Sequence, residues 1–166
     1  MDKFTMKLII ILLSFSPTIS FSQNLVTGVG GTYGSAIDSY GINGREYVFI
    51  GKHICFGPEL SYFPKTGITA KSLVELNFTG HYIFELTEHM GFYPLTGLNY
   101  SIEREIVEGI GEKESGFGLN LGVGIHYRVK NLFPFMEYKY ILGGLSQHLV
   151  SLGILFSFSK KKKHEE

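Results

Sequence analysis

The feature that most constrains the fold is a strict two-residue alternation between apolar residues and small or polar ones. From Phe117 to Val129 every odd-numbered residue is apolar, and every even-numbered residue is glycine, asparagine, histidine or arginine. Successive side chains of a β-strand point to opposite faces, so this period indicates a strand with one apolar and one polar face. After the first two dozen residues we find no apolar stripe with helical spacing over four turns. The alternation therefore predicts an all-β protein.

Similar alternation recurs in segments of about ten residues, which predicts eight antiparallel strands. The predicted strands are Leu25–Tyr33, Ile42–Ile50, Ile54–Tyr62, Val74–Phe84, Met90–Ile102, Phe117–Val129, Pro134–Leu142 and Val150–Phe158. The second strand has the weakest pattern, because Arg45, Tyr47 and Phe49 compete with the residues between them for the apolar face. Its orientation therefore stays open. Prolines lack an amide hydrogen, so Pro58, Pro94 and Pro134 should lie at bulges or where a missing donor is tolerated.

The connections between these strands also follow a pattern. Those at Gly51–His53, Thr87–His89 and Lys130–Leu132 are short, and those at Ser35–Gly41, Pro64–Ser72 and Glu103–Ser115 are longer, whereas Gly143–Gln147 is short although it lies on the longer side. An even number of strands with short turns on one side and longer loops on the other is typical of outer-membrane barrels. We therefore predict an eight-stranded, antiparallel, up-and-down transmembrane β-barrel.

The amino terminus has the order of a secretory signal peptide. Lys3 and Lys7 precede an apolar run, Leu8–Leu13, and small or turn-prone residues follow as far as Ser22. This order of a charged, an apolar and a small-residue region predicts cleavage, which we place after Ser22. The apolar run is too short to span a bilayer as a helix. We therefore divide the chain into a signal peptide (1–22), a barrel (23–158) and a charged tail (159–166).

Charge and cysteine content exclude several classes of protein. Without residues 1–22 the chain carries one more acidic than basic residue, whereas nucleic-acid binders concentrate positive charge. We therefore expect no nucleic-acid partner. Cys55 is the only cysteine, which excludes an internal disulfide and a multi-cysteine zinc site. Charged residues make up 18% of the chain, below the roughly 25% of ordinary soluble domains.

The aromatic residues of the apolar face predict which side meets lipid. Up-and-down strands place Tyr33, Tyr62, Tyr100, Phe117 and Tyr140 at one rim, and Tyr82, Phe84, Phe92, Tyr127, Phe156 and Phe158 at the other. Two girdles of aromatic rings are typical of barrels that span a membrane. The sparsely charged polar face then lines the lumen. A soluble lipocalin-like barrel, with its apolar face inside, is the alternative.

Three runs carry a resemblance to a known family: Tyr93–Tyr100 (YPLTGLNY), Phe117–Gly124 (FGLNLGVG) and Gly153–Phe158 (GILFSF). They resemble the small eight-stranded outer membrane β-barrel proteins, often labelled "porin family", which are similar in architecture to OmpX and the transmembrane domain of OmpA. The resemblance covers Asn24–Phe158. It implies a Gram-negative envelope protein in the bacterial outer membrane, with membrane lipid and the barrel-assembly machinery as partners. The family ends on an aromatic residue, whereas Ser159–Glu166 follow Phe158 here.

The polar face suggests a structural network of charges in the lumen. Its candidate members are Glu59, Glu75, His81, His126, Arg128, Glu137 and Lys139, and Arg45 joins them if it points inward. A path for protons or ions is the functional alternative. An eight-stranded barrel is just wide enough to be filled by side chains, and buried charges must be paired. We therefore interpret these residues as structural filling.

The sequence predicts no catalytic, cofactor or metal site. Ser146 and His148 stand two residues apart on one face of a strand, but no acidic residue nearby would orient the histidine. His81, His126 and Cys55 lack the spacing of metal ligands. We therefore expect a non-enzymatic protein without a cofactor.

The longer connections are the expected place of function. We interpret the acidic segment Glu103–Glu114 within the connection Glu103–Ser115 as a solvated, mobile extracellular loop, with a Ca²⁺- or partner-binding surface as the alternative. We expect a surface or structural role in the envelope with an extracellular ligand at the loops. The main alternative is a narrow pore for ions or small solutes. Two further alternatives are a lipid-modifying barrel enzyme and a soluble lipocalin-like binder.

Overall fold

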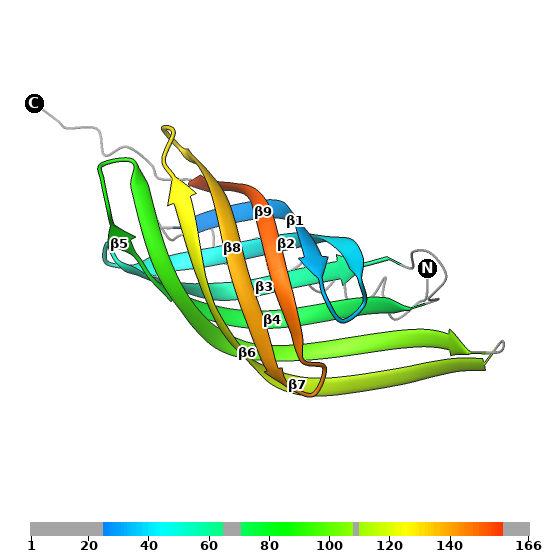
Figure 1. Ribbon diagram of the computed structural model, residues 1–166. Helices are drawn as coiled ribbons and strands as arrows, with labels where there is room; N and C mark the ends of the chain where they lie inside the picture. The colour runs from blue at the N-terminus through cyan, green and yellow to red at the C-terminus, as the bar shows by residue number, and fades with distance from the viewer. Residues whose placement is uncertain (1–24, 65–70, 108–109, 158–166) are drawn as a thin grey trace, which may run out of the picture.

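The computed structural model describes residues 25–64, 71–107 and 110–157, which form one antiparallel sheet closed into a barrel (Figure 1). Its strands are β1 (Leu25–Gly34), β2 (Ser39–Ile50), β3 (Ile54–Phe63), β4 (Ser72–Tyr82), β5 (Phe84–Glu85), β6 (Met90–Val107), β7 (Ile110–Tyr127), β8 (Leu132–Gly143) and β9 (Gln147–Ser157). β4 and β5 are separated only by Ile83 and both pair with β6, so they form one strand of the wall. β1 pairs with β9 and closes the ring. The predicted eight-stranded antiparallel barrel is confirmed.

The described residues include no helix that is long and apolar enough to cross a membrane. The predicted signal peptide, its cleavage site after Ser22, Phe158 and the charged tail lie outside the described residues.

The two-residue alternation becomes an outer and an inner face. On β7, Leu119, Leu121 and Val123 point outward and are exposed, whereas Asn120 between them is buried in the lumen. The uncertain orientation of the second strand is also resolved, because Arg45 and Tyr47 of β2 are buried inside. Each strand therefore presents its apolar face to the surroundings of the barrel.

The prolines lie where the sheet is interrupted, as expected. The β2–β3 pairing is broken opposite Pro58, and Pro94 of β6 lies opposite the break that separates β5 from β4. Pairing between β7 and β8 ends at Phe135, next to Pro134. The missing amide hydrogen of proline accounts for all three interruptions.

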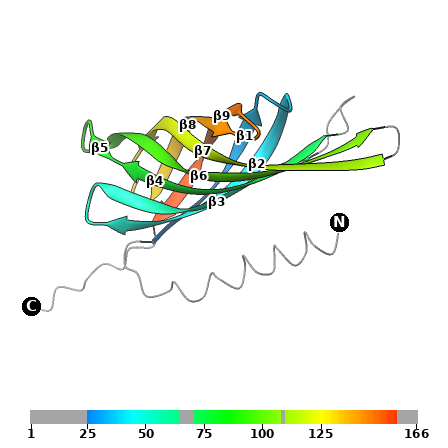
Figure 2. The same cartoon turned by 90° about the horizontal axis from the view of Figure 1, so that it is seen from below.

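The prediction that Glu103–Ser115 is a loop is wrong, although residues 112–115 are exposed, as expected for a solvated segment. β6 and β7 stay paired from Met90↔Tyr127 to Val107↔Ile110, and Figures 1 and 2 show them extending beyond the other strands. Alternation is a signal of a strand only where one face is buried. This part of the hairpin has charged residues on both faces, so its backbone pairing could not be read from the pattern.

The barrel has two ends, which we call the turn end and the hairpin end. The turn end carries the connections at residues 51–53, 86–89 and 128–131, and the hairpin end carries the projecting β6–β7 hairpin. Aromatic rings contact one another on the outer wall near both ends. Tyr100 and Phe117 lie 4.8 Å apart (ring centroids) at the hairpin end, and Tyr82 and Phe84 lie 4.8 Å apart at the turn end. These contacts agree with the predicted pair of aromatic rims.

Candidate functional site

Two cations and two carboxylates from opposite walls meet in the middle of the lumen. We call Arg45, Glu59, Glu137 and Lys139 the lumen ion-pair network. Lys139 Nζ lies 2.5 Å from Glu59 Oε2, and Arg45 Nη1 lies 3.0 Å from Glu137 Oε2. Each cation also lies 3.9 Å from the other carboxylate. All four residues are 3% exposed or less. The network therefore balances its own charge inside the barrel.

Neutral side chains hold the two carboxylates in place. Tyr47 Oη and Thr79 Oγ1 both donate to Glu59 Oε1, the second over 3.0 Å, and Tyr93 Oη donates to Glu137 Oε2 over 3.2 Å. Phe135 covers the guanidinium of Arg45, with 4.3 Å between its Cζ and the ring centroid. Hydrogen bonds of this kind offset part of the desolvation cost of buried charges.

Sequence reasoning missed Tyr47, Thr79 and Tyr93 as members of this arrangement. Tyr93 carried one available signal, because it is an aromatic residue on the polar face of its strand. Tyr47 lay on the strand whose orientation was open. Which residues meet across the lumen depends on the closure of the barrel, which no local pattern reveals.

A column of four rings lies beside the network, toward the turn end. The ring centroids of Tyr47 and His81 are 4.6 Å apart, those of His81 and Tyr93 are 5.0 Å apart, and those of Tyr93 and His126 are 5.9 Å apart. Glycines make room for it, since a Cβ on Gly124 would collide with the Tyr93 ring and one on Gly91 with the His126 ring. The rings thus form a layer that closes this side of the network.

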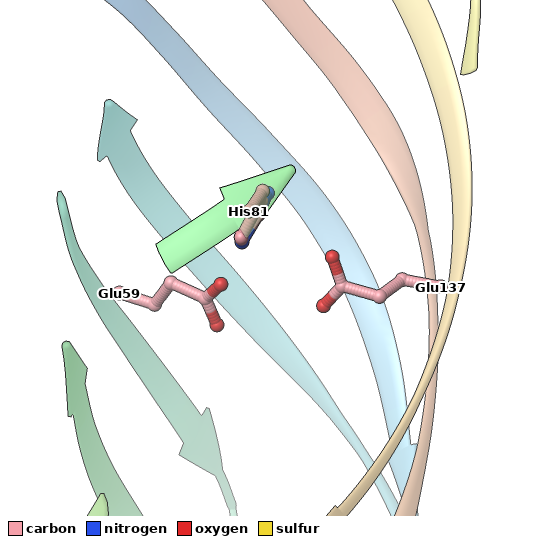
Figure 3. A group of neighbouring side chains, drawn as sticks. All are labelled: Glu59, His81 and Glu137. Carbon is pink, nitrogen blue, oxygen red and sulfur yellow. The ribbon is translucent and has the colours of Figure 1, made fainter. Parts of the chain in front are cut away.

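Glu59, His81 and Glu137 point toward one another from three strands, as Figure 3 shows. One potential ligand atom from each lies within 4.8 Å of the others, which is a possible arrangement of metal ligands. Most of these atoms are already engaged, however: Lys139 and Arg45 form ion pairs with the carboxylates, and His81 Nε2 lies 3.1 Å from Thr79 Oγ1. Glu137 Oε1 is buried without a hydrogen-bond partner among the described residues. The two protein cations supply the positive charge that a metal ion would bring. We therefore interpret this group as part of the ion-pair arrangement.

The remaining predicted network residues occupy different places. Glu75 is buried nearer the hairpin end, where it accepts a hydrogen bond from Gln147. His126 joins the column of rings. Arg128 is exposed at the turn end, with its guanidinium 5.4 Å from the ring centroid of Phe133. The structure thus brings Glu59, His81, Glu137 and Lys139 together, and leaves Glu75 and Arg128 apart from them.

Apolar side chains seal the lumen toward the hairpin end. One cluster of buried residues contains Ile37, Phe63, Leu73, Ile141 and Leu149. Between this cluster and the ion pairs, Asn77 accepts hydrogen bonds from Asn99 and Asn120 over 2.8 and 2.9 Å. The prediction of a lumen filled by small and charged residues did not anticipate such apolar clusters. Together these layers fill the cross-section of the barrel.

The turn end contains a cavity of about 480 Å³. Its lining combines cationic and histidine side chains with an apolar base, for example Arg128, His126, Phe133 and Leu155. The cavity stops at the column of rings, because Tyr47, His81 and Tyr93 also line it. It is therefore a vestibule that opens at the turn end and ends at the column of rings.

Ser146 and His148 do not form a catalytic pair. The hydroxyl of Ser146 donates to the carbonyl of Gly143 over 2.7 Å and so stabilises the β8–β9 turn. His148 Nδ1 lies 2.7 Å from the hydroxyl of Tyr138. The serine hydroxyl is thus engaged by backbone, and the histidine contacts a different side chain.

The β6–β7 hairpin separates its charges between two faces. Strand pairing places Glu103 opposite Glu114 and Glu105 opposite Glu112, on the face that continues the lumen side. Lys71 Nζ bridges Glu103 and Glu105 at 3.0 and 3.1 Å, and these hydrogen bonds raise the pKa of Lys71. Arg104 and Lys113 lie opposite each other on the other face. One face is therefore acidic and the other basic.

Comparison with known proteins gives structural matches alone. No protein-family model and no curated protein matches the chain. Among solved structures, it is similar to Neisserial surface protein A (NspA), with 16% identity over 82% of this chain and 98% of that chain and a TM-score of 0.64. It is similar to the N-terminal β-barrel domain of Pseudomonas aeruginosa OprF, with 16% identity over 81% of this chain and 97% of that chain and a TM-score of 0.66. It is also similar to Ail, the attachment invasion locus protein of Yersinia pestis, with 14% identity over 80% of this chain and 95% of that chain and a TM-score of 0.60. The chain therefore has the fold of the small eight-stranded outer membrane β-barrels.

Proposed function

We propose that this protein resides in the bacterial outer membrane and has a structural or surface-interaction role there, carried by the β6–β7 hairpin. The projection of this hairpin beyond a closed barrel is the observation on which the role rests (Figure 2). In this proposal both ends of the chain and the turn end are periplasmic, and the hairpin end is extracellular.

The outer wall supports membrane insertion. Large apolar side chains are exposed on every side of the barrel, including Val29 at 62%, Leu98 at 63% and Leu152 at 58%. Soluble monomers rarely expose apolar patches of more than a few hundred Å², and in hydrocarbon this wall needs no further cover. The same observation argues against a soluble lipocalin-like binder, whose apolar face would line the inside.

The filled lumen argues against the alternative of a narrow pore. A solute entering from the vestibule at the turn end would meet the column of rings, the lumen ion-pair network and then the apolar cluster near the hairpin end. Aqueous channels belong to barrels of about sixteen strands. The inside of this barrel thus supports stability better than transport.

The acidic face of the hairpin suits a partner with a basic surface. Four carboxylates lie on it, and Lys71 is the cation that bridges two of them. One structural neighbour, Ail, has been solved in complex with the heparin analogue sucrose octasulfate. Repulsion by the carboxylates makes a sulfated sugar a poor ligand for this face, so we propose a basic protein surface as the partner.

Shortening the hairpin tests this role. Joining Arg104 to Lys113 through Asn-Gly in place of residues 105–112 keeps a pair that is already opposed, and Asn-Gly favours a tight hairpin turn. We expect the purified variant in nanodiscs to lose most of its retention on immobilised lysozyme, a basic protein, at low salt. Surface plasmon resonance measures this loss, and neither the unmodified chain nor the shortened variant should bind immobilised albumin, which is acidic. Equal retention of the unmodified chain and the shortened variant on lysozyme would refute the proposed role of the hairpin.

A further inference from the structure

We propose that the vestibule at the turn end is a binding site for a small aromatic carboxylate. The carboxylate pairs with Arg128 at the mouth, and the ring of the ligand lies deeper, against Phe133 and the column of rings. In the proposed topology the site faces the periplasm. It lies at the opposite end of the barrel from the β6–β7 hairpin (Figure 1), so it does not depend on a partner there.

The vestibule has the size and the enclosure of a ligand site. Its volume of about 480 Å³ falls within the roughly 300–1,000 Å³ of small-molecule pockets. The column of rings forms its floor. Phe49 and Leu155 of its wall pack against the buried apolar cluster that contains Tyr47 and Tyr93. A ring that enters the vestibule is therefore surrounded by apolar and aromatic side chains.

Two polar side chains of the lining are positioned by ring contacts but have no polar partner. The guanidinium of Arg128 lies 5.4 Å from the ring centroid of Phe133, and Phe133 meets His126 edge to face, with 5.7 Å between the ring centroids. Within residues 25–64, 71–107 and 110–157, neither the Arg128 nor the His126 side chain forms a hydrogen bond or an ion pair. A guanidinium and an imidazole nitrogen thus remain for a ligand.

The other charges of the lining limit the charge of the ligand. Of the described residues that line the vestibule, Lys52 and Arg128 are cationic, and Glu85 and Glu88 are anionic. The lining as a whole therefore does not attract a polyanion. A phosphomonoester, with about −1.5 to −2 charges at neutral pH, is disfavoured by the two glutamates. A single carboxylate can pair with Arg128 alone.

The chemistry of the lining favours a planar body with a carboxylate at one end. Aromatic rings contact one another favourably in offset-stacked or edge-to-face arrangements, and Phe49, Tyr93 and Phe133 offer rings to the inside of the vestibule. Arginine binds a carboxylate through two parallel hydrogen bonds. Since Arg128 is exposed whereas Tyr93 is buried at the floor, the ligand enters ring first and keeps its carboxylate at the mouth.

Three indole compounds with the same ring but different charges test the proposal. Indole-3-acetate is anionic, indole-3-acetamide is neutral and tryptamine is cationic. The sequence contains no tryptophan, so the fluorescence anisotropy of the indole reports on the ligand when the full chain in nanodiscs is added, and empty nanodiscs correct for partition into lipid. We expect indole-3-acetate to bind at least about tenfold more tightly than the amide, as for a charge-assisted hydrogen bond, and tryptamine to bind most weakly.

Matched variants locate the binding. Arg128→Gln should weaken binding of indole-3-acetate by at least about tenfold and remove its advantage over the amide. Lys130→Gln removes an exposed cation of the same connection that does not line the vestibule, and should leave binding unchanged. Phe133→Leu removes the ring beneath Arg128 and should weaken binding of the acetate. Heat-modifiable migration on gels shows whether each variant has folded.

Equal binding of the three indoles would overturn the proposal, and so would an unchanged affinity of Arg128→Gln or an equal loss in Lys130→Gln. The variant with the shortened hairpin keeps the whole vestibule and should bind indole-3-acetate as the unmodified chain does. Failure of the partner proposal is therefore distinguishable from failure of this one.

Discussion

Replacing Glu59 by glutamine is expected to lower the free energy of unfolding by about 3–5 kcal/mol, because it leaves buried cations without an adequate counter-charge. Lys139 lies 2.5 Å from the Glu59 carboxylate and 3.9 Å from that of Glu137. The amide of glutamine can still accept the hydrogen bonds of Tyr47 and Thr79, so the variant isolates the effect of charge. Urea titration of the protein folded in lipid vesicles measures the change.

Two further variants control this experiment. Glu75→Gln removes a carboxylate that is equally buried, but Glu75 bonds Gln147 and forms no salt bridge with a described residue, so its effect should be much smaller. Combining Glu59→Gln with Lys139→Gln restores neutrality and should cost less than the sum of the two single changes. If Glu59→Gln and Glu75→Gln were equally destabilising, the lumen ion-pair network would not have the importance assigned to it.

Placing an arginine at Leu121 is expected to destabilise the folded protein in vesicles by about 2–4 kcal/mol, the cost of a cation on the lipid face at the bilayer midplane. Leu121 is 50% exposed on the outer wall and lies between Phe117 and Tyr127, which mark the two rims on β7. The same urea titration measures the effect.

The matched control lies at the turn end of the same strand face. Val129 is also exposed on the outside, but it lies beyond Tyr127, where a cation reaches the interface. Val129→Arg should therefore cost only about 0–1 kcal/mol. A similar cost at both positions would mean that the effect does not depend on depth, which would contradict the membrane-spanning arrangement.

Most of the barrel could be predicted because a wall with one apolar and one polar face requires a regular alternation of apolar and polar residues in the sequence. Each strand that separates an apolar face from a polar one carries the two-residue period, as Phe117–Val129 does. The prolines could be placed for a similar local reason, since a missing amide hydrogen must fall at a break in pairing. The orientation of β2 could not be predicted, because Tyr47 and Phe49 are apolar residues that point inward.

The features that could not be predicted depend on contacts between segments that are distant in the sequence. The lumen ion-pair network joins β2, β3 and β8. Closure of the barrel determines the partners of Glu59, and no spacing along the chain indicates them. The projecting part of the hairpin has charged residues on both faces, so its sequence carries no alternation between apolar and polar residues that would predict a strand. The cation pair of Arg104 and Lys113 emerges only once the register of that hairpin is known.

The central claim is that the alternating apolar side chains face hydrocarbon while their polar neighbours fill a closed lumen. Spin labels attached at Leu121→Cys and at Val129→Cys, each in a Cys55→Ser background and in lipid vesicles, test it most directly through collisions with oxygen and with a water-soluble nickel chelate. The claim predicts that the label at residue 121 collides readily with oxygen and hardly at all with the chelate, and that the chelate reaches residue 129 more easily. A label at residue 121 that is freely accessible to the chelate, or shielded from both reagents, would contradict it.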